Sequence, residues 1–381
     1  MNRVAVDPTL LRWARERADE SVESLVKHFP RYEAWEEGEL GPTLKQLEDF
    51  ARLTRVPVGY LFLSEPPVEE VPIPDLRTVG NEHLGHPSPE LLDTIYLCQH
   101  RQAWYRDWAR SIGDDPCAFV GASSLDSSVE ATAAEIREQL GFDLEARRDC
   151  RTWTEGLRQF IGQAEDAGIL VMVSGIVGSN THRALDPEEF RGFALADELA
   201  PLVFINGKDT KAAQMFTLAH ELAHIWLGES ALTDIGPASR PRRRIEVWCN
   251  EVAAELLVPL AVLRAEMPVG EPLNGVQGLA RRFKVSTLVI MRRLLDAGAL
   301  TRSAFEAAFG EELARLKNMA KQSSGGDFYL TQAARLSRRF ARALVASTLE
   351  GDTLYTDAFR MLGVRTPSTF RELGAQLGLP T

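Results

Sequence analysis

The sequence predicts an α+β protein that is mostly helical, with a small sheet near the middle of the chain. Many segments place apolar residues at helical spacing behind a capping residue, as Thr43 does before residues 44–51. After Gly168, short runs rich in Val, Ile, Leu and Phe predict strands at residues 169–176, 189–195 and 202–205. Two long helices are expected next, near residues 211–227 and 243–258.

The chain of 381 residues is long enough for two or three domains, and its composition indicates where they meet. Prolines are dense between Glu65 and Asp75, which predicts an extended linker. A run of Ser and Gly after Lys321 predicts a joint before the last helices. The predicted divisions are a helical domain at residues 1–68, a linker at 69–88, a central domain with a helical lead-in at 89–320, and a C-terminal helical segment at 321–381.

Composition excludes several classes of protein. The net charge of −11 argues against a protein that coats nucleic acid by charge alone. The first residues lack a signal-peptide pattern, and the longest apolar run, residues 169–177, is too short to span a bilayer. The four cysteines form no CxxC pair, which is typical of free thiols in a reducing compartment. We therefore expect a cytoplasmic protein with no membrane partner.

The segment that carries chemistry is His220-Glu221-Leu-Ala-His224, inside the predicted helix at residues 211–227. Residues four apart face the same way on a helix, so both imidazoles can reach one ion. Zn²⁺ accepts neutral imidazole nitrogen and, in catalytic sites, keeps one position for water. Glu221 is close enough to take a proton from that water, so the pattern predicts a zinc site with Glu221 as general base.

The following helix offers carboxylates for a third zinc ligand. On a helical wheel Glu246 falls inside the apolar arc, whereas Glu251 and Glu255 fall on the opposite side. A carboxylate on a buried face needs a partner, and a metal would serve. Asn250, one turn after Glu246, is placed to hydrogen-bond and orient a ligand. We favour Glu246, but Glu251 stays open because Asn-Glu after HExxH is also a zinc-peptidase pattern.

These residues resemble the ImmA/IrrE family of gluzincin-like metallopeptidases. The resemblance covers about residues 168–259, through Phe190-Arg-Gly-Phe-Ala-Leu, Pro201-Leu-Val-Phe-Ile-Asn, the HExxH segment and Glu246-Val-Trp-Cys-Asn-Glu-Val-Ala-Ala-Glu-Leu-Leu-Val-Pro. It implies a zincin-like core within residues 89–320, zinc ligands His220, His224 and Glu246, and Glu221 as general base. It also implies a zinc endopeptidase whose protein substrate is a transcriptional repressor, acting in stress response or mobile-element induction.

The N-terminal region resembles the XRE-like helix-turn-helix of long bacterial members. The resemblance rests on Trp35-Glu-Glu-Gly-Glu, Pro42-Thr-Leu-Lys-Gln-Leu-Glu and Val56-Pro-Val-Gly-Tyr-Leu-Phe-Leu. The would-be recognition helix is short and carries Glu33, Glu36 and Glu37, which are unfavourable near phosphates. Two interpretations stay open: a DNA-binding module, or a degenerate module for packing or docking, which the acidic residues favour.

A second basic helix-turn-helix-like pattern, residues 279–295, is expected to belong to the catalytic domain. The alternative function for the whole chain is a non-catalytic transcriptional regulator or binding module that keeps a structural or sensory zinc site.

Overall fold

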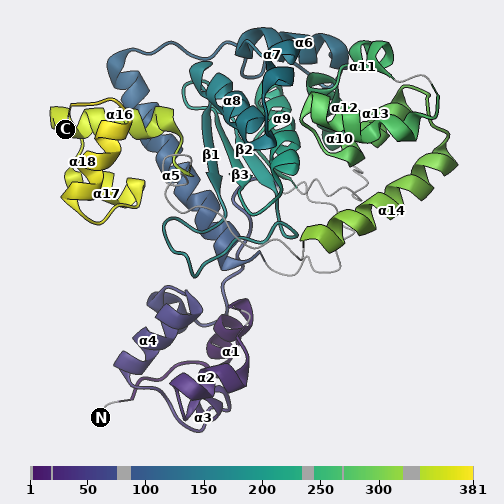
Figure 1. The fold of residues 1–381 in the computed structure, drawn as a ribbon. Coiled ribbons are helices and arrows are strands. Elements are labelled where there is room, and N and C mark those ends of the chain that lie inside the picture. The colour runs from purple at the N-terminus through teal and green to yellow at the C-terminus, as the bar shows by residue number, and fades with distance from the viewer. Residues whose placement is uncertain are drawn as a thin grey trace. The chain divides into compact units, whose positions relative to one another are not determined.

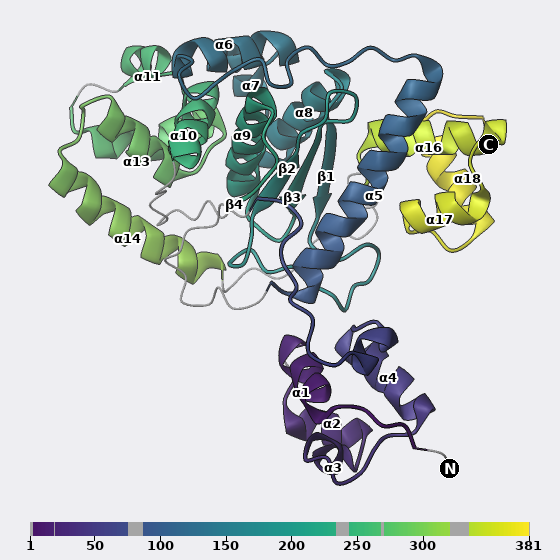
Figure 2. The same ribbon diagram turned by 180° about the vertical axis from the view of Figure 1, so that it is seen from behind.

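The computed structural model confirms the α+β class, with many helices around a small four-stranded sheet (Figures 1 and 2). It describes residues 3–18, 20–74, 87–233, 244–267, 270–320 and 335–380. Most of the predicted linker and the Ser/Gly-rich joint therefore lie outside the described residues. The chain divides into two compact units, Met1–Pro72 with Glu82–Ile95, and Ile73–Asn81 with Tyr96–Thr381. No described helix has the length and apolarity needed to cross a bilayer.

The first unit is a small helical bundle with its own apolar core. The Thr43 hydroxyl and the Gln46 side chain cap the start of one helix reciprocally, as a capping box. Tyr32 and Phe50 stack at the centre of the core, with ring centroids 5.6 Å apart. The elements of this unit are α1 (Pro8–Arg17), α2 (Val22–His28), α3 (Tyr32–Glu36), α4 (Leu44–Thr54) and the 3-10 turn η1 (Val58–Phe62).

The helix at the predicted recognition position, α3, has only five residues. Two of them, Tyr32 and Trp35, are buried in the core of this unit. Glu36 is also buried and accepts hydrogen bonds from Arg12 and Arg15 of α1. Much of α3 therefore serves packing within the first unit, and DNA binding stays an untested prediction.

The sheet of the second unit has the strand order β1-β3-β2-β4. Its strands are β1 (Leu170–Ser174), β2 (Gly192–Leu195), β3 (Leu202–Asn206) and β4 (Ala231–Thr233). β1 runs parallel to β3, whereas β2 is antiparallel to both β3 and β4. The strands are almost wholly buried, which explains why their sequences are continuous apolar runs rather than alternating ones.

Side chains alternate between the two faces of the sheet, and helices cover both faces (Figures 1 and 2). Val171, Val203 and Ala194 share the face that packs against α8 (Trp153–Asp166) and α9 (Lys211–Leu227). Met172 lies on the other face, where it meets Cys98 of α5 (Pro89–Ile112). α9 is thus fixed on a buried, rigid support.

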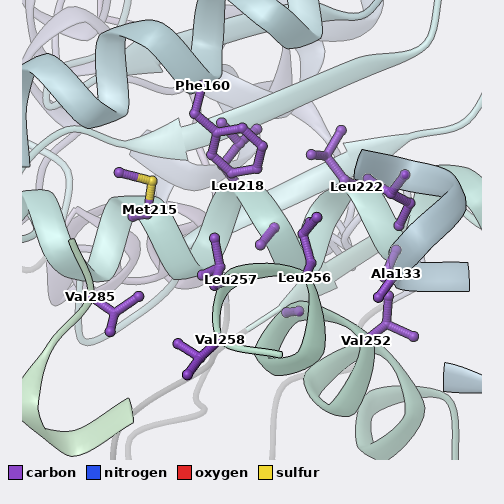
Figure 3. Close-up of a cluster of buried hydrophobic side chains, with 14 of the residues drawn as sticks. Ala133, Phe160, Met215, Leu218, Leu222, Val252, Leu256, Leu257, Val258 and Val285 are labelled. Atoms are coloured by element: carbon purple, nitrogen blue, oxygen red, sulfur yellow. The ribbon is translucent and has the colours of Figure 1, made fainter. Parts of the chain in front are cut away.

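The core extends from α9 to α10 (Arg244–Leu257) on its other side. Figure 3 shows Leu218 and Leu222 of α9 among side chains from α8 and α10, including Phe160 and Leu256. The remaining helices around this core are α6 (Val129–Leu140), α7 (Leu144–Asp149), α11 (Leu260–Glu266), the 3-10 turn η2 (Pro272–Gly275), α12 (Val276–Phe283), α13 (Thr287–Asp296) and α14 (Arg302–Ala320).

Three C-terminal helices, α16 (Arg338–Glu350), α17 (Tyr355–Leu362) and α18 (Pro367–Gln376), pack beside α5 (Figure 1). The rings of Trp104 and Phe340 meet edge to face at 5.7 Å. The buried Arg101 guanidinium donates to the Met361 carbonyl oxygen, with 2.8 Å between Nη2 and O. The C-terminal segment therefore belongs to the same compact unit as the sheet.

Candidate metal centre

The HExxH segment lies in the C-terminal half of α9, which has defined ends. The Thr210 hydroxyl accepts from the Ala213 amide at the start, and Gly228 closes the helix in the left-handed conformation, with φ of 71°. These are the helix start and stop that the sequence predicts. Between them, almost every residue from Gln214 to Trp226 is buried, because the sheet lies on one side of α9 and α10 on the other.

Three predicted ligands converge between α9 and α10. The Nε2 atoms of His220 and His224 are 3.1 Å apart. The Glu246 carboxylate lies 3.5 Å from His220 Nε2 through one oxygen and 3.2 Å from His224 Nε2 through the other. Ligands about 2.0–2.1 Å from a tetrahedral zinc ion are about 3.3–3.4 Å apart. The three side chains are therefore spaced as zinc ligands would be.

The structure separates the candidates on α10. Glu246 is 5% exposed and faces α9, whereas Glu251 is exposed on the opposite side of the helix. Glu255 also points away from the histidines, but it is buried because it pairs with Arg293 of α13. The wheel does not anticipate that second buried carboxylate, since the position of α13 depends on tertiary packing. Of the three carboxylates, only Glu246 reaches the histidines.

The buried polar atoms of this site fit a cation. Glu221 Oε2 has no hydrogen-bond partner among the described residues, and Glu246 Oε1 has only the His224 imidazole, 3.2 Å away. Two imidazole nitrogens facing each other at 3.1 Å present lone pairs that can share at most one proton. A buried polar atom without a hydrogen-bond partner lowers the stability of the fold. A metal ion bound here would interact favourably with these atoms.

Glu221 is held by the sheet rather than by α10. The Thr233 hydroxyl of β4 donates to Glu221 Oε1, and the backbone at Gly192 of β2 passes beside the same oxygen. Burial raises the pKa of Glu221 to about 8, although the His220 charge and the Thr233 hydrogen bond oppose the shift. Neither Thr233 nor Gly192 is recognisable from the sequence as part of the site, because each reaches Glu221 only through strand pairing.

Asn250 occupies the supporting position that its spacing predicts. Its Oδ1 lies 3.1 Å from His220 Nδ1. An amide oxygen accepts a hydrogen bond from the protonated Nδ1, which leaves the lone pair of His220 on Nε2, facing His224 and Glu246. Burial opposes ionisation of Glu246, yet the two imidazoles outweigh it and hold the pKa of Glu246 at about 2. Glu246 is thus an anion in this setting.

A thiol that the sequence analysis treated as an ordinary free cysteine also lies here. The donor atoms of His220, His224 and Cys249 are all within 4.8 Å of one another. Cys249 follows Glu246 by three residues on α10, so both face α9. The spacing of three residues between Glu246 and Cys249 is visible in the sequence, and it could have indicated that the thiol lies near the proposed metal ligands. The two imidazoles therefore have a carboxylate and a thiol among their neighbours.

Comparison with known families agrees with this geometry. Residues 164–295 match a peptidase family model described as the IrrE N-terminal-like domain, which spans all four strands, α9, α10 and the basic pattern in α12 and α13. Residues 336–376, which include α17 and α18, match a model described as a domain of unknown function (DUF8813). No curated protein matches the chain. The first match supports placing residues 164–295 in the ImmA/IrrE family, and with it a peptidase of the metal-dependent kind.

Proposed function

We propose that this chain is a zinc-dependent endopeptidase, with His220, His224 and Glu246 as the metal ligands and Glu221 as the general base. The observation that carries the proposal is the convergence of three donor side chains, spaced 3.1–3.5 Å apart, in a buried site. The IrrE N-terminal-like match over the same residues supports a peptidase. Both helices rest on a packed core, which gives the site the rigidity that catalysis requires.

The roles of the side chains follow from their positions. Zinc bound here would lower the pKa of a coordinated water to about 7 and polarise a substrate carbonyl. Glu221 Oε2 has no partner among the described residues, so in its ionised form Glu221 would be the group placed to act as general base. Thr233 fixes the other oxygen and so sets the direction of Oε2. Asn250 holds His220 with Nε2 toward the metal position.

The proposed substrate is a protein, and by the family resemblance a transcriptional repressor or a similar regulator. The alternative is a transcriptional regulator or binding module that retains a structural or sensory zinc site without turnover. One observation favours the alternative: a fourth donor, Cys249, is close to the histidines, and structural zinc sites are those in which the protein fills all positions. The two functions agree on bound zinc and differ on proteolysis.

The first test measures metal content by element-resolved mass spectrometry after dialysis. About one zinc per chain is expected in the wild type, with marked loss in His220→Ala and Glu246→Ala. Glu251→Ala is the matched control, since it removes a carboxylate from the exposed side of the same helix. Loss of zinc in Glu251→Ala but not in Glu246→Ala would overturn the assignment of Glu246 as a ligand. Absence of zinc from the wild type would refute the proposed zinc site.

The second test separates the peptidase from the alternative. Zinc-loaded protein is incubated with a peptide library made from a bacterial lysate, and new peptide termini are counted by mass spectrometry. The peptidase predicts cleavage by the wild type and none by Glu221→Gln, with equal zinc in both. Cleavage that persists in Glu221→Gln would show that Glu221 is not the base. Absence of cleavage by both the wild type and Cys249→Ala, with full zinc in each, would favour the regulator.

A further inference from the structure

Cys249 lies on the face of α10 that carries the proposed metal ligand Glu246. It is three residues after Glu246, so its side chain is on the same face of the helix, and none of it is exposed. Its sulfur and the two histidine donor atoms lie within 4.8 Å of one another. Most buried cysteines only fill space, whereas this one is placed among imidazoles and a carboxylate.

The three donor atoms are no more than 4.8 Å apart, which limits any rearrangement that coordination needs. Zinc binds thiolate at about 2.3 Å and imidazole nitrogen at about 2.0–2.1 Å, so a tetrahedral site places sulfur about 3.5 Å from each nitrogen. The fully buried Glu221 Oε2, which has no hydrogen-bond partner among the described residues, is a second observation that points to a cation in this pocket.

We infer that Cys249 is a fourth, exchangeable donor to the metal that His220, His224 and Glu246 hold. The inference rests on the proposed zinc site. Two imidazoles, one carboxylate and one thiolate fill a tetrahedral ion completely and leave no position for water. The carboxylate and the thiolate also neutralise the charge of Zn²⁺, which suits a buried site. The chain therefore has a closed, latent form, and cleavage requires the thiolate to leave the metal.

The closed form gives the chain a way to stay inactive while folded and metal-loaded. The position that Cys249 fills is the one that a catalytic zinc site keeps for water. Replacing Cys249 by Ala removes this competitor without touching the other three donors. The Cys249→Ala variant is accordingly expected to cleave the peptide library faster than the wild type.

Cobalt(II) reports thiolate coordination directly and needs no substrate. The full-length metal-free chain is titrated with Co²⁺, and the near-ultraviolet sulfur-to-cobalt charge-transfer band is recorded beside the visible ligand-field bands. The wild type is expected to show both kinds of band, and Cys249→Ala only the ligand-field bands. Cys98→Ala is the matched control, because it removes a thiol that is equally buried but packs against Met172 instead. His220→Ala tests whether cobalt occupies this site.

The outcomes separate the inference from the proposed function. Ligand-field bands in the wild type without the charge-transfer band would overturn Cys249 as a donor while leaving the metal site intact. Failure of the wild type to bind cobalt, or full binding by His220→Ala, would overturn both. X-ray absorption of the zinc-loaded wild type needs no variant that might misfold. It is expected to show one sulfur at about 2.3 Å, and a shell of nitrogen and oxygen alone would reject the inference.

Discussion

Gly192 of β2 lies close to the HExxH helix, and adding one methyl group there tests the architecture of the site. A Cβ on Gly192 would lie 2.5 Å from Thr217 Cγ2, 2.8 Å from the Phe204 carbonyl oxygen and 3.1 Å from Glu221 Oε1. The first two contacts are with a packed helix and a strand backbone, so α9 has to move. Overpacking of this kind costs about 1–3 kcal/mol. We expect Gly192→Ala to lower stability by that amount and to weaken zinc binding.

The assay is chemical denaturation followed by tryptophan fluorescence, together with a zinc titration of each variant. Gly162→Ala is the control, because Gly162 lies inside α8 with no atom within 4 Å of an added Cβ. That substitution is expected to leave zinc affinity unchanged and to raise stability by about 0.5–1 kcal/mol, since alanine favours a helix over glycine. If Gly192→Ala matched the wild type in both stability and zinc affinity, the close packing of β2 against α9 would not constrain the site.

Three further predictions concern charged and polar groups. As pH rises from the ordinary carboxyl pKa of 4.5 through about 8, the metal-free wild type is expected to lose a few kcal/mol, because unfolding releases the proton that burial retains on Glu221. Glu221→Gln removes that dependence, and denaturation at pH 6 and pH 9 measures the difference. Asn250→Ala is expected to lower zinc affinity roughly 10- to 100-fold in a chelator competition, and an unchanged affinity would exclude its orienting role. Arg293→Ala strands the buried Glu255 and is expected to cost about 3–5 kcal/mol, whereas Glu255→Gln with Arg293→Met costs less by the same denaturation assay.

The fold class was predictable because its signals are local. Thr210 and Gly228 bound α9 as residue types alone indicate, and the three apolar runs after Gly168 correspond to β1, β2 and β3. β4 was not predicted, since three residues show no periodicity and Ala231–Thr233 becomes a strand only by pairing with β2. The expected XRE-like character of the first unit and the limits of the domains stay predictions.

The site was predictable to the extent that helical spacing determines which side chains share a face. His220 and His224 are four apart, and Glu246 and Asn250 are four apart, so periodicity alone groups each pair. What periodicity cannot supply is the contact between elements. Thr233 reaches Glu221 only because β4 pairs with β2 beneath α9.

The two faces of α10 carry buried polar groups that pack against different elements. One face carries Glu246 and Cys249 toward α9, while the other is fixed by the buried pair of Glu255 and Arg293 and by the Arg293 hydrogen bond to the Val258 carbonyl, 2.9 Å long. The apolar core around Leu256 offsets the cost of removing these polar groups from water. In small zinc domains the metal drives folding, whereas here α9 and α10 also pack against each other through a large apolar core. Metal removal is therefore expected to leave the helical circular dichroism intact, and a large loss of helix on chelation would show that the ion, rather than the core, organises α9 and α10.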